Sequence, residues 1–210
     1  MLLPLTALLL TGCAPSAAAG SAAPAPTAPP SGPVLRVVAV GDSITEADSV
    51  AFDDGRIGEA SWARWADGDG IDVLGGWAHA GATTADMLAA VRPLDADVVV
   101  IMGGSNDIDV DVPTDQVLEQ LTGIAAVVGV PRVLLSAVPP EDGHEADVTA
   151  LNARLAELAQ RSGWQFTDPM TGVRDGNGSW LPGDTDDGVH PTAAAAQLIG
   201  TDLRAALLSG

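Results

Sequence analysis

Five short apolar runs, each ended by glycine, proline or a polar residue, recur along most of the chain. The clearest is residues 97–102 (DVVVIM), which is followed directly by a pair of glycines. Short runs rich in β-branched residues and stopped in this way are typical of buried β-strands. The same interpretation applies to the other four runs. We therefore predict strands over residues 34–40, 71–74, 97–102, 132–138 and 165–167.

Between these runs, apolar residues return every three or four positions, which is the spacing of an amphipathic helix. In residues 146–162, for example, Leu151, Leu155 and Leu158 fall on one face. The same spacing predicts helices over residues 61–66, 84–91, 114–128 and 192–208. Apolar strands that alternate with helices imply an α/β fold, a three-layer α/β/α sandwich with a five-stranded parallel sheet. Ligands bind such sheets beyond the carboxyl ends of the strands, so chemistry is expected there.

The first 33 residues differ from the rest, because they carry no charged side chain. Residues 1–10 (MLLPLTALLL) are too few to span a bilayer but suit the apolar core of a signal peptide. A Leu-Thr-Gly-Cys sequence then ends at Cys13 and resembles the bacterial lipoprotein signal, although no Lys or Arg precedes the apolar run. The resemblance implies that residues 1–12 are a cleaved lipoprotein signal peptide. It also implies that Cys13 is lipidated and holds an exported protein on the extracytoplasmic face of the cell membrane.

Residues 14–33 contain only Ala, Pro, Ser, Gly and Thr. Such a composition cannot bury a core, and its repeated prolines favour an extended, solvated chain. At roughly 3 Å per residue, the segment could reach on the order of 60 Å. We expect residues 13–33 to be a linker that begins with the lipidated cysteine. Residues 34–210 are long enough for one domain with its own core.

The charge of the chain lies entirely on this domain. Asp and Glu number 28, the nine basic residues are all Arg, and the formal net charge is −19. Such a surface repels phosphate groups, because Lys and Arg supply the attraction to nucleic acids. We therefore exclude nucleic acid as a partner. The single cysteine leaves no internal disulfide to form.

Two glycine-containing motifs follow the first two predicted strands. In Gly41-Asp42-Ser43-Ile44, the serine lies in a strand-to-helix turn, where the positive end of a helix and its free N–H groups favour an oxyanion. Taken alone, this serine is also consistent with a residue whose sole role is to cap the helix. Gly81 lies between the second predicted strand and a helix, where a glycine lets backbone approach a ligand with an unblocked N–H. A plain turn glycine explains it as well.

Two polar motifs follow later strands. Asn106 lies in Gly-Gly-Ser-Asn-Asp directly after the strongest strand, and its amide could stabilise an oxyanion or simply form a turn. Asp187 precedes His190 by three residues in a tight loop. The carboxylate can accept from one ring nitrogen and leave the other to take a proton from a serine. The alternative is a histidine in a surface loop. Pro191 suits the first position of the following helix.

Together, the four motifs resemble those of the SGNH (GDSL-type) hydrolase family, whose blocks supply Ser, Gly, Asn and His in this chain order. The likeness covers the domain and rests on the segments GDSI, GGSND and DGVHPT. It implies a flavodoxin-like SGNH hydrolase fold. By this resemblance Ser43 is the nucleophile, His190 the general base and acid, and Asp187 its orienting carboxylate. The N–H groups of Ser43 and Gly81 and the side chain of Asn106 would form the oxyanion hole.

The resemblance implies a carboxylic ester hydrolase that works through an acyl-enzyme and needs no cofactor. We expect the long acidic segment 45–60 to wall the acyl or alcohol pocket. Other loops near the motifs are polar, with Trp180 and Leu181 as exceptions, so short acyl groups are expected, acetyl above all, on a carbohydrate or another polar alcohol. Two alternatives stay open. The chain could be a surface acyltransferase with the same triad, or a binding lipoprotein without catalysis.

The sequence does not favour a metal site. Asp107, Asp109 and Asp111 alternate, but they lack the twelve-residue loop with a terminal Glu that binds calcium. The three histidines are far apart in the chain, and no cysteine accompanies them as in zinc sites. We therefore expect solvated carboxylates and no metal.

Overall fold

The computed structural model describes residues 33–210, which contain a single five-stranded sheet. The expected signal peptide, Cys13 and all of the linker except Pro33 lie outside these residues. Every strand pair is parallel, and the strand order is β2-β1-β3-β4-β5. The strands are β1 (Leu35–Gly41), β2 (Ile71–Ala78), β3 (Val98–Met102), β4 (Arg132–Ser136) and β5 (Gln165–Thr167). The predicted α/β class and five parallel strands are confirmed.

The helices follow the expected alternation with the strands. They are α1 (Ser43–Glu46), α2 (Trp62–Ala66), α3 (Thr84–Ala90), α4 (Ser105–Asp109), α5 (Thr114–Val128), α6 (Glu145–Ser162) and α7 (Ala193–Ser209), with a 3₁₀ turn, η1, at Phe52–Asp54. Strand β2 is longer than predicted, because it continues through Gly75 and Gly76. A Cβ at Gly76 would lie 2.1 Å from the carbonyl oxygen of Ala39, so only glycine lets β2 pair with β1 here.

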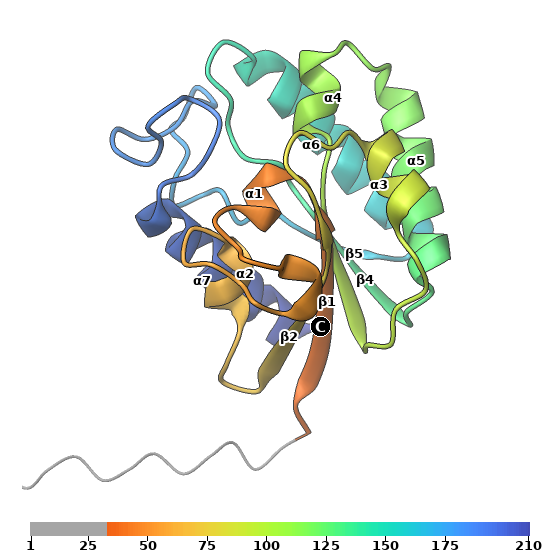
Figure 1. Cartoon of the computed structure of the whole chain (residues 1–210). Helices are drawn as coiled ribbons and strands as arrows, with labels where there is room; N and C mark the ends of the chain where they lie inside the picture. The colour runs from red at the N-terminus through yellow and green to blue at the C-terminus, as the bar shows by residue number, and fades with distance from the viewer. Residues whose placement is uncertain (1–32) are drawn as a thin grey trace, which may run out of the picture. The chain divides into compact units, whose positions relative to one another are not determined.

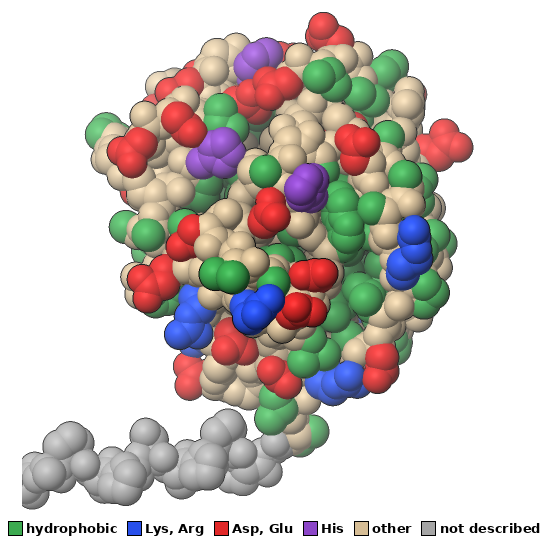
Figure 2. Space-filling view, viewed as in Figure 1, with side chains coloured by type: hydrophobic (Ala, Val, Ile, Leu, Met, Phe, Trp, Pro, Cys, Tyr) green, Lys and Arg blue, Asp and Glu red, His purple; other side chains and the backbone are tan. Residues whose placement is uncertain are grey.

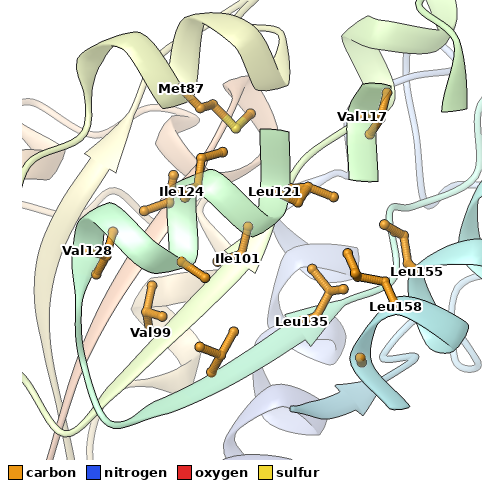
Figure 3. Close-up of a cluster of buried hydrophobic side chains, with 14 of the residues drawn as sticks. Met87, Val99, Ile101, Val117, Leu121, Ile124, Val128, Leu135, Leu155 and Leu158 are labelled. Atoms are coloured by element: carbon orange, nitrogen blue, oxygen red, sulfur yellow. The ribbon is translucent and has the colours of Figure 1, made fainter. Parts of the chain in front are cut away.

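Helices cover both faces of the sheet, and β1 shows why (Figure 1). Alternate side chains of a strand point to opposite faces. Val38 and Val40 pack in one core cluster with residues of α3, α5 and α6. Val37 and Ala39 pack in the other with residues of α2 and α7. Figure 3 shows the first cluster, where Met87 of α3 and Ile124 of α5 lie over Val99 and Ile101 of β3. The sheet is thus the middle layer of three.

The strand order also locates the region where a ligand would bind. Strand β1 has β2 on one side and β3 on the other, so the chain changes its direction of growth between them. Connections on the two sides of such a point leave toward opposite faces and open a crevice at the carboxyl ends of the strands. Ser43 follows β1 and Asn106 follows β3. Both therefore lie at this topological switch point. Within the described residues, no helix has the length and apolar character needed to cross a membrane.

Candidate active site

Ser43 is held by a tight and buried turn. Asp42 caps helix α1, and its Oδ1 accepts the N–H of Ile44 at 3.0 Å. A Cβ at Gly41 would lie 2.1 Å from Oγ1 of Thr45, so the turn requires glycine there. Thr45 is fully buried, and its Oγ1 accepts the indole N–H of Trp62 at 3.0 Å. Packing and hydrogen bonds therefore fix the backbone on both sides of the serine.

His190 is held by hydrogen bonds within its own loop. Oδ1 of Asp187 accepts the backbone N–H of His190 at 2.8 Å and that of Val189 at 3.0 Å. The N–H of Gly188, whose φ is +84°, donates to Oγ1 of Thr185 at 3.0 Å. The Asp187 carboxylate also contacts the imidazole ring, because its Oδ2 lies 2.7 Å from Nδ1 of His190. One aspartate thus shapes the loop and orients the imidazole.

The two segments meet at the serine. Nε2 of His190 lies 2.9 Å from Oγ of Ser43, although the residues are 147 positions apart in the chain. Because the ionised Asp187 can only accept, Nδ1 carries the ring proton and Nε2 is free to accept the serine proton. The backbone N–H of His190, together with its ring, holds the pKa of Asp187 well below the usual range. The structure therefore brings all three predicted triad residues into hydrogen-bond contact.

The proposed oxyanion donors come from the loops after β1, β2 and β3. The side-chain amide of Asn106 donates one hydrogen bond to the carbonyl of Ala82 at 3.0 Å, which leaves its second N–H available. This contact ties Asn106 to the loop of Gly81, which has a φ of +76° and open space where a Cβ would be. Among the described residues, the N–H groups of Ser43 and Gly81 donate to no other protein group.

Two supporting carboxylates were not predicted, and the expectation that Asp107 is solvated is wrong, because it is 1% exposed. Asp107 is buried and accepts the backbone N–H of Thr84 at 2.9 Å and its hydroxyl at 2.7 Å, which ties α4 to the start of α3. Glu46 accepts the N–H of Ala80 at 2.7 Å and so holds the loop that contains Gly81. Both act on backbone far away in sequence. The only available signal was their position, because Asp107 ends the GGSND motif and Glu46 lies two residues after GDSI.

The aspartate before the nucleophile is the fourth carboxyl of the site. Asp42 is 1% exposed, and its Oδ2 has no hydrogen-bond partner within residues 33–210. Burial raises the pKa of Asp42 to about 7, even though the backbone N–H of Ile44 opposes the shift. The pKa values of Asp42 and Asp187 are therefore shifted in opposite directions, although both residues belong to the same site.

A cavity of about 320 Å³ opens beside Ser43 and His190. Its other lining residues are Ile44, Ala47, Asp48, Ala60 and Pro191. Ala47, Asp48 and Ala60 belong to the segment 45–60, which walls the pocket as expected. Trp180 does not line it. The ring is buried in the core and donates to the carbonyl of Gly188 at 3.2 Å, so it supports the loop that carries His190.

The three-layer parallel fold and the hydrogen-bonded Ser-His-Asp set define a hydrolase. Residues 39–198 match the model of the GDSL-like Lipase/Acylhydrolase family, so the chain belongs to that family. It is accordingly a carboxylic ester hydrolase with the SGNH fold. Among curated proteins, none matches this chain in sequence.

Solved structures of similar fold support the architecture. A lipase/acylhydrolase from Enterococcus faecalis is 20% identical with a TM-score of 0.65, and the match covers 84% of this chain and 96% of that one. A GDSL-like lipase from Bacteroides thetaiotaomicron is 20% identical with a TM-score of 0.64, covering 83% and 88%. The M. smegmatis aryl esterase is 21% identical with a TM-score of 0.63, covering 84% and 99%. At these sequence identities, the comparisons show only that the folds are similar.

Proposed function

We propose that the protein hydrolyses short-chain carboxylic esters through a covalent acyl-enzyme on Ser43. The observation that carries the proposal is the continuous set of contacts from Asp187 through His190 to Ser43, at 2.7 and 2.9 Å. Both distances are those of good hydrogen bonds, as a nucleophile, its base and an orienting acid require.

The geometry gives each residue a role in the reaction. Oγ of Ser43 attacks the ester carbonyl while Nε2 of His190 takes its proton. Asp187, whose pKa is lowered, stays ionised and stabilises the imidazolium. The free amide N–H of Asn106 and the N–H groups of Ser43 and Gly81 stabilise the oxyanion. His190 then protonates the departing alcohol and later activates the water that releases the acid.

The pocket and its surroundings favour a small acyl group. The cavity of about 320 Å³ is small, and its apolar lining consists only of Ile44, Ala47, Ala60 and Pro191, so it suits a short chain better than a long one. Each buried CH₂ contributes about 0.8 kcal/mol, so a long acyl chain needs an apolar slot. We infer acetyl or similar groups. Acidic side chains are spread over the face shown in Figure 2, with fewer basic ones, so a neutral alcohol such as a carbohydrate suits the enzyme better than an anionic one.

A labelling experiment separates an enzyme from a binding protein. A fluorophosphonate probe should modify Ser43, identified by peptide mass, and Ser43→Ala should not be labelled. His190→Ala is the matched control, because it keeps the serine but lacks the base and should react far more slowly. Equal labelling of the wild type and Ser43→Ala would contradict the proposal.

The acyl preference is tested with p-nitrophenyl esters from acetate to decanoate. We expect the highest kcat/KM for the shortest esters. A steady rise with chain length would contradict the short-acyl assignment. Addition of a neutral alcohol tests the acyltransferase alternative, because transfer yields a new ester whereas hydrolysis yields only the free acid.

We also propose that Cys13 anchors the enzyme to the membrane on its extracytoplasmic face. Support comes from the apolar run of residues 1–10, the Leu-Thr-Gly-Cys sequence and the uncharged linker that follows. Cys13→Ser should move the protein from the detergent phase to the aqueous phase in Triton X-114 partition. If the wild type and the variant partition alike, the anchor is disproved.

A further inference from the structure

Three side chains of types that bind metal ions lie close together outside the triad. Asp109 ends helix α4, Glu141 lies in the loop after β4, and His144 immediately precedes α6. One carboxylate oxygen of each acid and one ring nitrogen of the histidine all lie within 4.8 Å of one another. The sequence separates these residues, and the fold brings them together.

Glu141 is the unusual member of this group. The residue is 4% exposed, and its Oε2 has no hydrogen-bond partner among residues 33–210. A buried carboxylate without a donor is costly unless a proton or a cation compensates it. Burial, together with the neighbouring Asp109 carboxyl, raises the pKa of Glu141 to about 7. The buried oxygen therefore needs either a proton or a cation beside it.

The imidazole of His144 lies between two carboxylates. Its Nδ1 lies 3.5 Å from Oδ2 of Asp147, on the first turn of α6, and its Nε2 lies 4.0 Å from Oδ1 of Asp109. A carboxylate beside one ring nitrogen favours the tautomer in which the other nitrogen binds metal. Nε2 thus faces Asp109 while Asp147 takes the outer position.

We propose that Asp109, Glu141 and His144 form a binding site for a divalent cation of the zinc type. One imidazole and two carboxylates suit Zn²⁺, whereas Mg²⁺ and Ca²⁺ prefer oxygen ligands alone. The side chains of Asp109 and His144 are partly exposed and can rotate to close on an ion. Three protein ligands leave a fourth position for water.

Such an ion would connect three segments of the fold. Asp109 lies three residues after Asn106 in the same short helix, so the ion would fix α4 against the start of α6. The cation site itself does not depend on the proposed esterase function.

Zinc titration of the full chain by isothermal calorimetry tests the site. All proteins carry Cys13→Ser so that the thiol cannot bind zinc, and all are treated with EDTA and dialysed first. We expect one Zn²⁺ per chain and a rise in the thermal unfolding temperature with zinc concentration, because the ion binds only the folded state. Ca²⁺ and Mg²⁺ should bind at least tenfold more weakly.

Three variants assign the ligands. Glu141→Gln, His144→Asn and Asp109→Asn should each weaken zinc binding tenfold or more. Because Asp109 is exposed, Asp109→Asn should fold normally. It therefore tests zinc binding even if a change at the buried Glu141 disturbs folding. His79→Asn is the matched control, because His79 is also exposed and lies 3.7 Å from a carboxylate, that of Glu46. Absence of zinc binding in the parent protein, or unchanged affinity in the three variants, overturns the proposal and leaves a shared proton at Glu141. Equal affinity for Ca²⁺ overturns the zinc assignment.

Discussion

The segments that carry Ser43 and His190 are held in place in different ways. The serine turn is buried, with Asp42, Thr45 and Trp62 all at most 1% exposed. In the His190 loop, the ring and the Asp187 carboxylate are about half exposed, and hydrogen bonds to that carboxylate fix the backbone. Changes in the first segment should therefore act on stability and those in the second on activity, except where the changed group touches the substrate.

The largest expected effect comes from the reacting groups themselves. Ser43→Ala and His190→Ala should each lower kcat by about 10⁴- to 10⁶-fold, because neither nucleophile nor base can be replaced. Asp187→Asn should cost less, since it disturbs only orientation and charge. Thermal unfolding should change little in Ser43→Ala and His190→Ala. Retention of half the activity by Ser43→Ala would exclude this serine as the nucleophile.

Asn106 extends the comparison to a third segment. Asn106→Ala removes an amide donor to the oxyanion and should lower kcat by about 10²- to 10³-fold with little change in KM. Asn177→Ala is a suitable control, because Asn177 is an exposed residue whose amide contacts only Asp175. An effect confined to KM would instead make Asn106 a ground-state binding residue.

The carboxyls of the two segments predict opposite dependence of stability on pH. A pKa of about 7 for folded Asp42, above the ordinary value of 3.8, means that the folded state binds more protons between pH 4 and 7. Its contribution to stability therefore falls as pH rises through that window. Asp187 has a lowered pKa, so its ionised form stabilises the folded state above pH 4, and this contribution is lost on acidification.

Asp42→Asn should accordingly flatten the decline of the free energy of unfolding between pH 4 and 7. Urea unfolding at several pH values measures it. Glu141, whose pKa is also raised to about 7, contributes in the same direction, so the slope should shrink rather than vanish. An unchanged slope would show that Asp42 stays ionised in the folded protein.

The smallest expected effects are the stability changes caused by substituting two threonines, one in each segment. Thr45→Val removes the acceptor for the buried indole N–H of Trp62 and should cost about 1–3 kcal/mol of unfolding free energy. Thr185→Val removes the acceptor for Gly188, but that loop is near water, so the stability cost should be under about 1 kcal/mol. The second change should lower kcat more than the first. Equal stability costs would contradict the contrast between the segments.

Much of the fold could be predicted from the sequence, because local periodicity determines it. Helix α5 and strand β5 have the predicted bounds, 114–128 and 165–167. Helix α4 was not expected, since SNDID is a short polar segment without an apolar repeat. The predicted second strand ended too early, before Gly75 and Gly76, because the role of these glycines depends on close contact with the neighbouring strand.

The site was only partly predictable. Asp187 and His190 are neighbours in sequence, so their pairing could be predicted from spacing. Glu46 and Asp107 bind backbone 34 and 23 residues away, and no local pattern reports such contacts. Trp180 stood out as an apolar exception among the polar loops, but an apolar residue beside a catalytic loop can line a pocket or be part of the core. Only the three-dimensional arrangement distinguishes the two.

The separation of 147 residues between Ser43 and His190 has a consequence for biosynthesis. A ribosome makes the serine turn early, and all five strands are complete by Thr167. Asp187 and His190 are added only after the whole sheet has been translated. Helix α7, which covers one face of the sheet, is also made after this point. A chain that ends in this interval therefore lacks both its base and part of its core. Ester hydrolysis would in this way report on completion of the polypeptide as well as on its folding.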